Sequence, residues 1–455
     1  MATSRSNPKT YRAIWRWHFY AGLIVAPFLL ILSLTGAIYL FNDEINDATM
    51  PHLRFVETVT DPMPVSHLMR SALHDYPGTV TRVDMPSAAN RSAIVFVRTD
   101  DNQDQRVAVN PQTAEVLGAY IYAQTLVGFA DRMHGSLTLG TIGDRIVELA
   151  ACWALVLIIT GLYLWWPRGL KGPGGIVYPR LWLKGRLFWR DIHAVTGIWS
   201  AAVIIFLILT GLPWAGVQGN VVKQVAASVG VGYPASNRNY NAPKSDPTMK
   251  GALGEAPWTL EDTPLPKSDP HAGHPGHHIA PAQKDEAAIA GVDAITAQLM
   301  VHGLTQPYRL FMPSGPEGVY TVYTYPDQPE GQRTLYFDRY SSALIREIAY
   351  ADYGWAAKAI ELGVQLHMGN YFGLANQVLM LLACVTIVML VISGFIMWWR
   401  RRPEGEAGFP ARIPDTRLRV ATGLLIIGGM LLPLMGASLI IVWVIDRIWL
   451  WRKQS

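Results

Sequence analysis

The sequence has little charge for its length. Of its 455 residues only 16% are charged, 50% are hydrophobic, and the mean hydropathy is +0.18. This composition is more apolar than that of an ordinary soluble protein and indicates a membrane protein. The net charge of +4 gives no reason to expect a nucleic-acid partner, because nucleic-acid-binding domains carry a concentrated excess of basic residues.

Cysteine and nucleotide-binding motifs are also scarce. The two cysteines, Cys152 and Cys384, lie in apolar runs, so the polar segments contain no disulfide. No Cys-x-x-Cys-His string occurs, which excludes covalent attachment of a c-type haem. The string nearest to a glycine-rich dinucleotide fingerprint begins at Gly230 in a polar segment and lacks the third glycine. We therefore expect no nicotinamide or flavin domain.

Five long stretches without charge predict membrane-spanning helices, because each approaches or exceeds the roughly 20 residues that cross a bilayer. They are Phe19–Phe41, Leu149–Trp166, Ala194–Val222, Tyr371–Trp399 and Val420–Ile445. The first is too long for a signal-peptide core, and we interpret it as a retained anchor. The last contains Gly428, Gly429, Pro433 and Gly436, so it could form one kinked crossing or a hairpin, and we expect one kinked crossing. Three basic residues follow it, Arg447, Arg452 and Lys453, and they favour a cytoplasmic tail. A single crossing would instead place the tail on the periplasmic side.

Lysine and arginine accumulate in three short segments that flank these stretches. The segments precede the first stretch, join the second to the third, and join the fourth to the fifth. By the positive-inside rule all three are cytoplasmic. The two long segments, 43–145 and 223–366, then lie on the periplasmic side of a bacterial inner membrane, and each is large enough for a small domain.

The chain contains an internal repeat. The string MHGSLTLG matches LHMGNYFG at an offset of 233 residues, and the match runs without a gap to the Trp165–Trp166 and Trp398–Trp399 pairs. The helix that begins near His18 matches the one that begins near His193 at an offset of 175. Each has a glycine four residues after the histidine and a Thr-Gly pair seventeen and eighteen residues after it. A unit of helix, external domain and helix therefore occurs twice in the same orientation.

The two external segments show the same order of predicted elements. An amphipathic stretch comes first, in Val65–Tyr76 and in Ala287–Met300, and alternating strand-like runs follow, in Ser92–Arg98 and in Val319–Tyr325. The strings VAVNPQTAEVLG and LYFDRYSSALI then predict a strand, a polar turn and a strand. The pattern predicts two small α+β modules.

The doubled unit, the two turn strings, the MHGSLTLG and LHMGNYFG segments and the Trp-Trp pairs resemble the PepSY-associated transmembrane family over nearly the whole chain. The resemblance implies an α-helical transmembrane bundle of four helices in two parallel repeats, with a fifth C-terminal helix and two small α+β PepSY-like domains in the periplasm. The family includes iron-regulated inner-membrane proteins and reductases of ferric siderophores.

These features predict the following division of the chain. Residues 1–42 form the cytoplasmic N-terminus and first membrane helix, 43–125 the first PepSY-like domain, 126–168 an interfacial segment and second helix, 169–192 a cytoplasmic loop, 193–222 the third helix, 223–284 an insertion, 285–350 the second PepSY-like domain, 351–402 an interfacial segment and fourth helix, 403–418 a cytoplasmic loop, and 419–455 the fifth helix and tail.

Four of the twelve histidines lie at or beside the ends of predicted membrane helices and are related by the repeat: His18, His134, His193 and His367. A lone histidine there is most simply an interfacial side chain. Polar groups at membrane depth are costly and tend to mark function, however, and imidazole is a common axial ligand of haem iron. A twofold axis along the membrane normal would pair His18 with His193 at the cytoplasmic end, and His134 with His367 at the periplasmic end. The pattern predicts two bis-histidine b-type haems.

Residues near the histidines could complete these sites. Gly22 and Gly197 lie one turn from a histidine and would either leave room for a flat macrocycle or allow close helix packing. Four arginines could pair with haem propionates: Arg12, Arg16, Arg132 and Arg190. The topology rule explains three of them equally well, whereas Arg132 lies on the external side.

The second external segment carries an insertion, 223–284, that is rich in Pro, Asn, Ser, Asp and Gly, and we expect it to be flexible. Its string DPHAGHPGHHIAP contains His271, His274, His277 and His278. Clustered imidazoles can bind Zn, Cu or Ni, although weak surface binding without a dedicated function is the simpler interpretation.

Three functional hypotheses follow. The first is a di-haem reductase that passes electrons from a cytoplasmic flavoprotein, a ferredoxin or a membrane quinol to a periplasmic ferric chelate such as a siderophore, in support of iron acquisition. The second is a non-enzymatic PepSY membrane protein that regulates or binds a partner through its external modules. The third is metal uptake or buffering through the histidine-rich string. A haem absorption band in the purified protein would separate the first hypothesis from the second.

Overall fold

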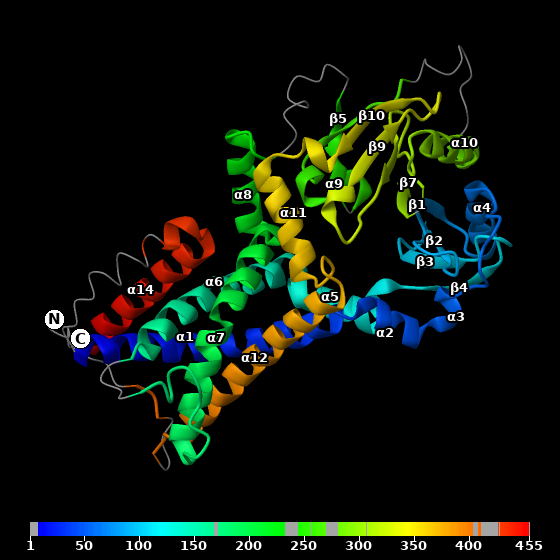
Figure 1. Ribbon diagram of the computed structural model, residues 1–455. Helices are drawn as coiled ribbons and strands as arrows, with labels where there is room; N and C mark the ends of the chain where they lie inside the picture. The colour runs from blue at the N-terminus through cyan, green and yellow to red at the C-terminus, as the bar shows by residue number, and fades with distance from the viewer. Residues whose placement is uncertain are drawn as a thin grey trace. The chain divides into compact units, whose positions relative to one another are not determined.

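The computed structural model describes most of the chain as two compact units (Figure 1). The described residues are 8–167, 172–232, 244–254, 256–269, 281–305, 307–403, 408–410, 426 and 428–454. The first unit, called the helical unit below, comprises residues 1–40, 130–224 and 367–455. The second, called the sheet unit, comprises residues 41–129 and 225–366.

In the part of the chain that the structure describes, four helices of the helical unit are long and apolar enough to span a membrane. They are α1 (Pro8–Tyr39), α6 (Gly140–Trp165), α7 (Gly185–Gly211) and α12 (Leu374–Trp399). Each overlaps one of the first four predicted stretches, which are helical because only a helix satisfies the backbone of such an apolar run. The third predicted stretch, Ala194–Val222, is longer than α7 and continues into a separate helix, α8 (Gly216–Ser228). Helices α1 and α7 each pack against both α6 and α12, so the four form a bundle. The chain is a membrane protein.

A short helix precedes the second spanning helix of each repeat. These are α5 (Leu126–Ser136), before α6, and α11 (Trp355–His367), before α12. Residues with positive φ separate each pair, including Gly140 at 59° and Gly369 at 83°. Since glycine adopts this conformation without strain, Gly140 at the start of α6 and Gly369 after α11 let the chain enter the next helix at a new angle.

The segment after α12 reverses direction instead of crossing once. It turns at Pro433, the first residue of α14 (Pro433–Gln454), which packs against α6. The two arms of the turn touch, because a Cβ placed on Gly429 would lie 2.9 Å from the Cα of Gly436. The expectation of a single kinked crossing is therefore wrong for this part of the chain. Proline interrupts the helical hydrogen bonds and the glycines allow the arms to meet. Residues 420–425 of the predicted stretch lie outside the described residues.

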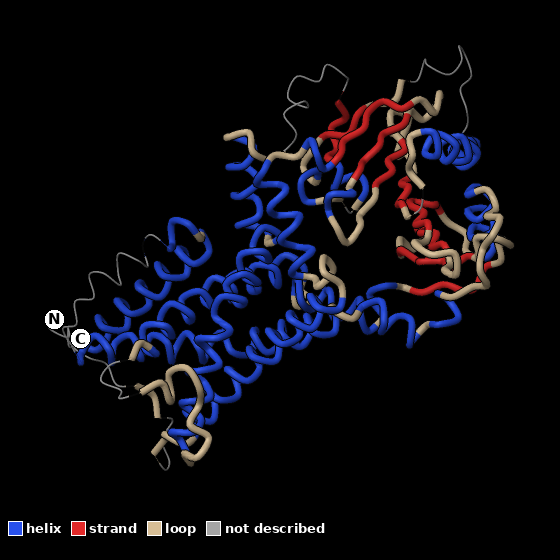
Figure 2. Tube along the Cα trace, in the orientation of Figure 1, coloured by secondary structure: helices blue, strands red, loops and turns tan. Residues whose placement is uncertain are grey.

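The sheet unit contains an eight-stranded antiparallel sheet in the order β10-β9-β8-β7-β1-β2-β3-β4 (red in Figure 2). The strands are β1 (Thr79–Met85), β2 (Ala93–Arg98), β3 (Asp104–Val109), β4 (Val116–Tyr120), β7 (Tyr308–Phe311), β8 (Tyr320–Tyr323), β9 (Arg333–Phe337) and β10 (Leu344–Ala349). The predicted strand-turn-strand strings correspond to β3–β4 and β9–β10, and each repeat supplies four strands. The sequence predicted two separate modules, but β1 pairs with β7, with Val83 opposite Leu310. This pairing hides two strand edges that would otherwise be exposed.

The two predicted amphipathic stretches form α4 (Val65–Asp75) and α10 (Pro281–Val301), which pack against each other. Leu68 from α4 and Ile295 from α10 are fully buried in one hydrophobic core shared with strands of both repeats. The Ser66 hydroxyl also donates to a carboxylate oxygen of Asp293 at 2.6 Å. The two halves of the repeat therefore share one core.

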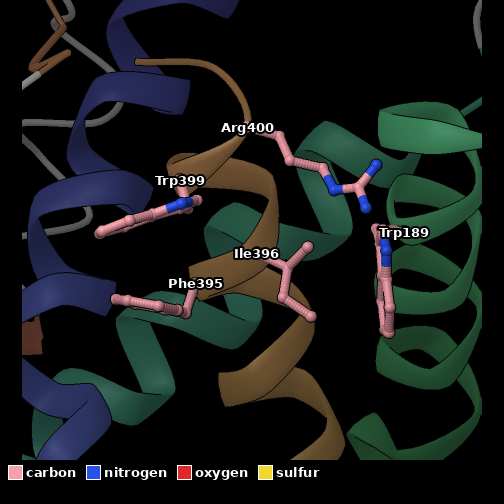
Figure 3. Close-up of a pocket in the computed structure, with 5 residues that line it drawn as sticks. All are labelled: Trp189, Phe395, Ile396, Trp399 and Arg400. Carbon is pink, nitrogen blue, oxygen red and sulfur yellow. The ribbon is translucent and has the colours of Figure 1, made fainter. Parts of the chain in front are cut away.

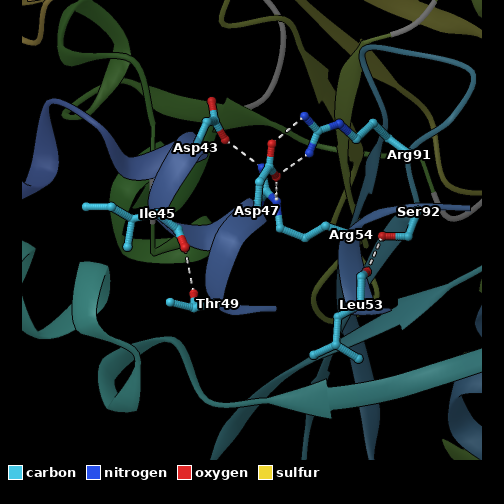
Figure 4. Close-up of polar contacts among 8 residues, drawn as sticks. All are labelled: Asp43, Ile45, Asp47, Thr49, Leu53, Arg54, Arg91 and Ser92. Atoms are coloured by element: carbon cyan, nitrogen blue, oxygen red, sulfur yellow. Dashed lines mark hydrogen bonds and ion pairs between the residues drawn. The ribbon is translucent and has the colours of Figure 1, made fainter. Parts of the chain in front are cut away.

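Ion pairs hold the first residues of the sheet unit in place (Figure 4). They involve α2 (Asn42–Thr49), α3 (Pro51–Arg54) and the loop before β2. The Asp47 carboxylate accepts hydrogen bonds from both Arg91 and Arg54. The hydrogen bond from the Arg91 guanidinium, with a smaller effect from Arg54, holds the pKa of Asp47 below its usual value.

The insertion 223–284, which we expected to be flexible, is folded in several described parts. These are the end of α8 (Gly216–Ser228), β5 (Lys244–Thr248), α9 (Met249–Leu253) and β6 (Pro264–Pro266). Met249, Trp258 and Leu260 are at most 3% exposed. The expectation is wrong for these parts, because three large apolar side chains give a polar segment enough buried surface to fold.

Candidate functional site

The structure brings the four repeat-related histidines together as two pairs within the helical unit. His18 on α1 lies beside His193 on α7, with the ring centroids 6.3 Å apart and the ring planes at 90°. His134 in the last turn of α5 lies beside His367 in the last turn of α11, at 6.4 Å and 86°. Each pair joins equivalent positions of the two repeats, as the sequence predicts.

The two pairs lie near opposite ends of the bundle. His18 is in the first half of α1, whereas the ring of His134 contacts Thr35 near the other end of the same helix. Thr35 is 17 positions after His18, which corresponds to about 26 Å along a helix. This distance makes the pairs two separate sites.

In the first repeat, a threonine hydroxyl lies against each histidine. His18 Nδ1 is 2.9 Å from Thr160 Oγ1 on α6, and His134 Nδ1 is 3.2 Å from Thr35 Oγ1 on α1. Each hydroxyl comes from the other spanning helix of the same repeat. The repeat therefore orients its own two histidines, and the pairing of rings occurs between repeats.

The second repeat has the same arrangement with one substitution. His367 Nδ1 is 2.9 Å from Thr210 Oγ1 on α7, and His193 Nδ1 is 3.0 Å from Ser393 Oγ on α12. His193 Nδ1 is also 3.1 Å from the backbone carbonyl oxygen of Leu390. A hydroxyl group therefore lies against Nδ1 of all four rings.

The direction of these hydrogen bonds determines which ring nitrogen carries hydrogen. Each hydroxyl is 2.7 or 2.8 Å from the carbonyl oxygen four residues earlier on its own helix and donates to it. Its one hydrogen is therefore used, and toward histidine the oxygen can only accept. Nδ1 then carries the hydrogen and Nε2 keeps the lone pair, which is the form of imidazole that binds a metal.

A glycine follows each of these hydroxyl residues and lies next to the histidine ring. A Cβ placed on the glycine would stand 3.1, 3.3, 3.5 or 3.6 Å from the ring carbon Cε1, at Gly36, Gly161, Gly211 and Gly394 respectively. The two shorter distances are tighter than ordinary contact, so a side chain there would push the ring. The Thr-Gly or Ser-Gly pair thus supplies a hydrogen-bond acceptor and space for the ring at once.

The other glycines that the sequence singled out have a packing role. A Cβ on Gly22 would meet Leu157 at 3.7 Å, and a Cβ on Gly197 would meet Leu390 at 3.6 Å. Both distances are ordinary contacts between neighbouring helices of one repeat. Close helix packing, one of the two interpretations offered above, therefore describes these positions.

The two histidines of the second pair, which lie on the short helices α5 and α11, have lowered pKa values. Burial lowers the pKa of His367 to about 4, and the neighbouring His134 adds to the effect. Burial also lowers the pKa of His134. A neutral imidazole is required for metal coordination, so the electrostatics of this pair agree with the hydrogen-bond pattern.

The separation within each pair fits a metal ion between the two rings. A metal–imidazole bond is about 2 Å long and the ring centroid lies about 1.15 Å beyond the nitrogen, which puts two trans imidazoles about 6.3 Å apart between centroids. The observed values are 6.3 and 6.4 Å. A direct edge-to-face contact between the rings is also compatible with this separation. Among the described residues, no group of three or more His, Cys, Asp or Glu side chains could hold a metal ion.

A cavity of about 390 Å³ is lined by residues of α7 and α12 (Figure 3). In the sequence these residues are near His193 and near the glycine that contacts it. Four apolar side chains and one guanidinium line it: Trp189, Phe395, Ile396, Trp399 and Arg400. Trp189 is one helical turn before His193, and Phe395 directly follows the glycine on which that histidine rests. Arg400 extends from the end of α12 toward α7. The Arg400 guanidinium is the charged group among these five lining residues. The sequence pattern did not indicate Arg400 as a candidate residue.

The arginines that the sequence did single out have different surroundings. Arg190 donates to the buried carboxylate of Asp191 at 2.8 Å, so it serves an ion pair. The Arg16 guanidinium lies 5.6 Å from the centre of the Tyr20 ring. Arg12 and Arg132 are exposed. The four histidines of the polar tract lie outside the described residues: His271, His274, His277 and His278.

A comparison with protein families gives one finding for this chain. The family described as PepSY-associated TM region matches residues 15–401. That range contains all four histidines of the two pairs and the four hydroxyl residues that contact them. A search of curated proteins finds no match.

Proposed function

Since the chain belongs to the family of PepSY-associated TM regions, we propose that it is a di-haem b-type membrane reductase. Each histidine pair would hold one haem, and the two haems would supply sites for one electron each near the two ends of the bundle. The observation that carries the proposal is the environment of the four rings. All four have Nδ1 against a hydroxyl that can only accept, and both pairs have the ring separation of two axial imidazoles.

The residues of the chain have distinct roles in this proposal. The Nε2 atoms of the histidines would hold the haem iron, and the threonine and serine hydroxyls keep the rings in the tautomer that can coordinate a metal. The glycines leave space for the rings, and the spanning helices exclude water. Arg400, which lines the cavity with Trp189, would supply a cation for a propionate of a haem held by the first pair. When bound, each haem supplies a carrier of one electron.

The arginine-rich flanks give the proposed orientation in a bacterial inner membrane. The first pair lies at the cytoplasmic end, the second pair at the periplasmic end, and the long segments of the sheet unit in the periplasm. The reversal at Pro433 removes the earlier difficulty with the basic tail, because a hairpin returns Arg452 and Lys453 to the side from which it started.

The proposed substrate is a ferric chelate such as a siderophore in the periplasm. One electron converts Fe(III) to Fe(II), whose lower charge weakens its bonds to hard oxygen ligands and so releases the iron. The electron comes from a cytoplasmic flavoprotein, a ferredoxin or a membrane quinol. The role of this activity would be iron acquisition.

Reduction across a membrane tests this function directly. The full chain is placed in vesicles loaded with a reduced viologen, with ferric desferrioxamine and a ferrous-specific dye outside. We expect dye colour to form only with protein present, to be lost in His134→Ala, and to persist in His74→Ala, whose histidine is an exposed residue of the sheet unit. Equal rates for empty vesicles and for vesicles with protein would contradict the proposal.

A further inference from the structure

The two faces of the eight-stranded sheet differ in composition. Val83, Val95 and Leu310 lie opposite one another on adjacent strands and belong to the core shared with α4 and α10. Because side chains alternate along a strand, the residues next to them project from the other face. On that face the strand register forms a row of cations and aromatic rings in the order Arg106, Phe96, Arg82 and Phe311.

The guanidinium groups of this row lie against aromatic rings. The Arg82 guanidinium carbon is 4.0 Å from the centre of the Phe96 ring. The Arg106 guanidinium carbon is 5.0 Å from the same ring and 3.9 Å from the centre of the Tyr122 ring. Contact with a ring face holds a guanidinium in place while its edge can still donate hydrogen bonds to an anion.

A third arginine lies in the neighbouring row of the same face. Arg309 on β7 lies opposite Asp84 on β1, and its guanidinium carbon is 5.7 Å from the centre of the Tyr323 ring. The Asp84 carboxylate accepts hydrogen bonds from Arg82 at 2.5 and 2.6 Å and is 4.0 Å from Arg309 Nε. These three guanidiniums share one carboxylate, so this part of the face has a net positive charge.

The two outer arginines are accessible to a ligand. Arg82 is 7% exposed and is fixed by Asp84, whereas Arg106 and Arg309 are both partly exposed. In the part of the chain that the structure describes, Arg106 has no ion pair. Strands β3 and β7, which carry the two outer arginines, are separated by β2 and β1 and so lie about 14 Å apart. A small molecule can span this distance.

We infer that this surface, called the arginine–aromatic face below and formed by Arg82, Phe96, Arg106, Tyr122 and Arg309, binds an iron chelate with a net negative charge and aryl ligand groups such as catecholates. The inference rests on the proposed function, which makes a ferric chelate the substrate. Phenolate oxygens give such a chelate its charge and accept hydrogen bonds from the outer arginines. Its flat rings pack on Phe96 and Tyr122, which are partly exposed. A chelate with a cationic group is repelled by the same arginines.

Binding of gallium chelates by the detergent-purified full-length protein tests the inference without electron transfer, because Ga(III) is close to Fe(III) in size but is not reduced. The probes are the gallium complexes of azotochelin, an anionic bis-catecholate, and of desferrioxamine, which has an ammonium group and no aromatic ring. In calorimetric titrations we expect the azotochelin complex to bind, with an affinity that falls as salt is added. The desferrioxamine complex should bind about tenfold more weakly. No binding of the azotochelin complex, or equal affinity for both, would overturn the inference.

Matched arginine variants test the location of the site. Arg106→Gln and Arg309→Gln should each weaken binding of the azotochelin complex about tenfold, the effect of one lost charge-assisted hydrogen bond. Arg70→Gln removes the same charge from α4, on the other face of the sheet, where Arg70 pairs with Glu286 at 2.7 Å, and should bind as the wild type does. Circular dichroism melts show that each variant is folded, and Arg106→Lys, which keeps the charge, should bind more tightly than Arg106→Gln.

Two results with the variants would contradict the site. One is wild-type affinity in both Arg106→Gln and Arg309→Gln, and the other is an equal loss of affinity in Arg70→Gln. A protein that binds the gallium chelate but contains no haem would overturn the proposed function and not this inference, so calorimetry and haem content separate the two failures.

Discussion

Removal of single histidines should reveal the two pairs as units. His134 and His367 are 6.4 Å apart between ring centroids and would share one metal ion. Loss of either ring removes one of two axial ligands, so His134→Ala and His367→Ala should each lower the haem content from two to one per chain. The double variant should also retain one, because the site is already disabled. The first pair is about 26 Å away along the helix axis and should be unaffected.

A cross-pair variant supplies the contrast. His18→Ala combined with His134→Ala removes a ligand from each site, and we expect no bound haem. Haem per chain is measured as the pyridine haemochrome of detergent-purified protein, with size-exclusion chromatography to show that each variant is folded. The exposed His74→Ala variant should keep two haems. Loss of both haems in the variant that lacks His134 and His367, or retention of one in the cross-pair variant, would refute this arrangement.

Other perturbations test particular contacts. Gly36→Ala puts a Cβ 3.1 Å from His134 Cε1 and should lower haem content at that site, whereas Gly211→Ala, at an ordinary 3.5 Å from its ring, should not, as haemochrome measurements would show. Burial raises the pKa of Glu361 in the folded protein. The contribution of Glu361 to the free energy of unfolding is therefore largest below the ordinary carboxyl pKa and declines as the pH rises toward the higher folded pKa. Glu361→Gln should therefore unfold at a higher temperature than the wild type at about pH 8, and circular dichroism melts that show the same pH slope in both proteins would contradict this. Asp191→Ala removes the partner of two arginines and should lower the free energy of unfolding by about 2 kcal/mol, and a change near zero in denaturant titrations would show that this ion pair contributes little.

The repeat is the reason that much of this molecule could be predicted from its sequence. Apolar runs indicate the four spanning helices, and the offsets of the repeat pair His18 with His193 and His134 with His367. The hydroxyl partners were only partly visible. The Thr-Gly pairs of α1 and α7 were part of the repeat match. Thr160, however, aligns with a serine, and a small residue at this position could equally serve helix packing.

The remaining differences depend on contacts between distant parts of the chain. The joining of β1 to β7 requires two edge strands from opposite repeats to meet, and neither strand carries a signal for its partner. The reversal at Pro433 depends on two glycine backbones that touch, whereas the hydropathy of the segment is the same for a kinked helix and a hairpin. In the insertion, Trp258 is buried, and the backbone N–H of the next residue, Thr259, donates to Glu361 far away in the sequence, so local composition underestimated the order of this segment.

The visible absorption spectrum of the purified full-length protein tests the central claim most directly. The account predicts two haem b groups per chain, both six-coordinate, with sharp bands that appear on reduction by dithionite and do not change when carbon monoxide is added, since two histidines occupy both axial positions. A folded, membrane-inserted protein that is colourless would contradict the account, because the four rings would then be structural contacts between helices.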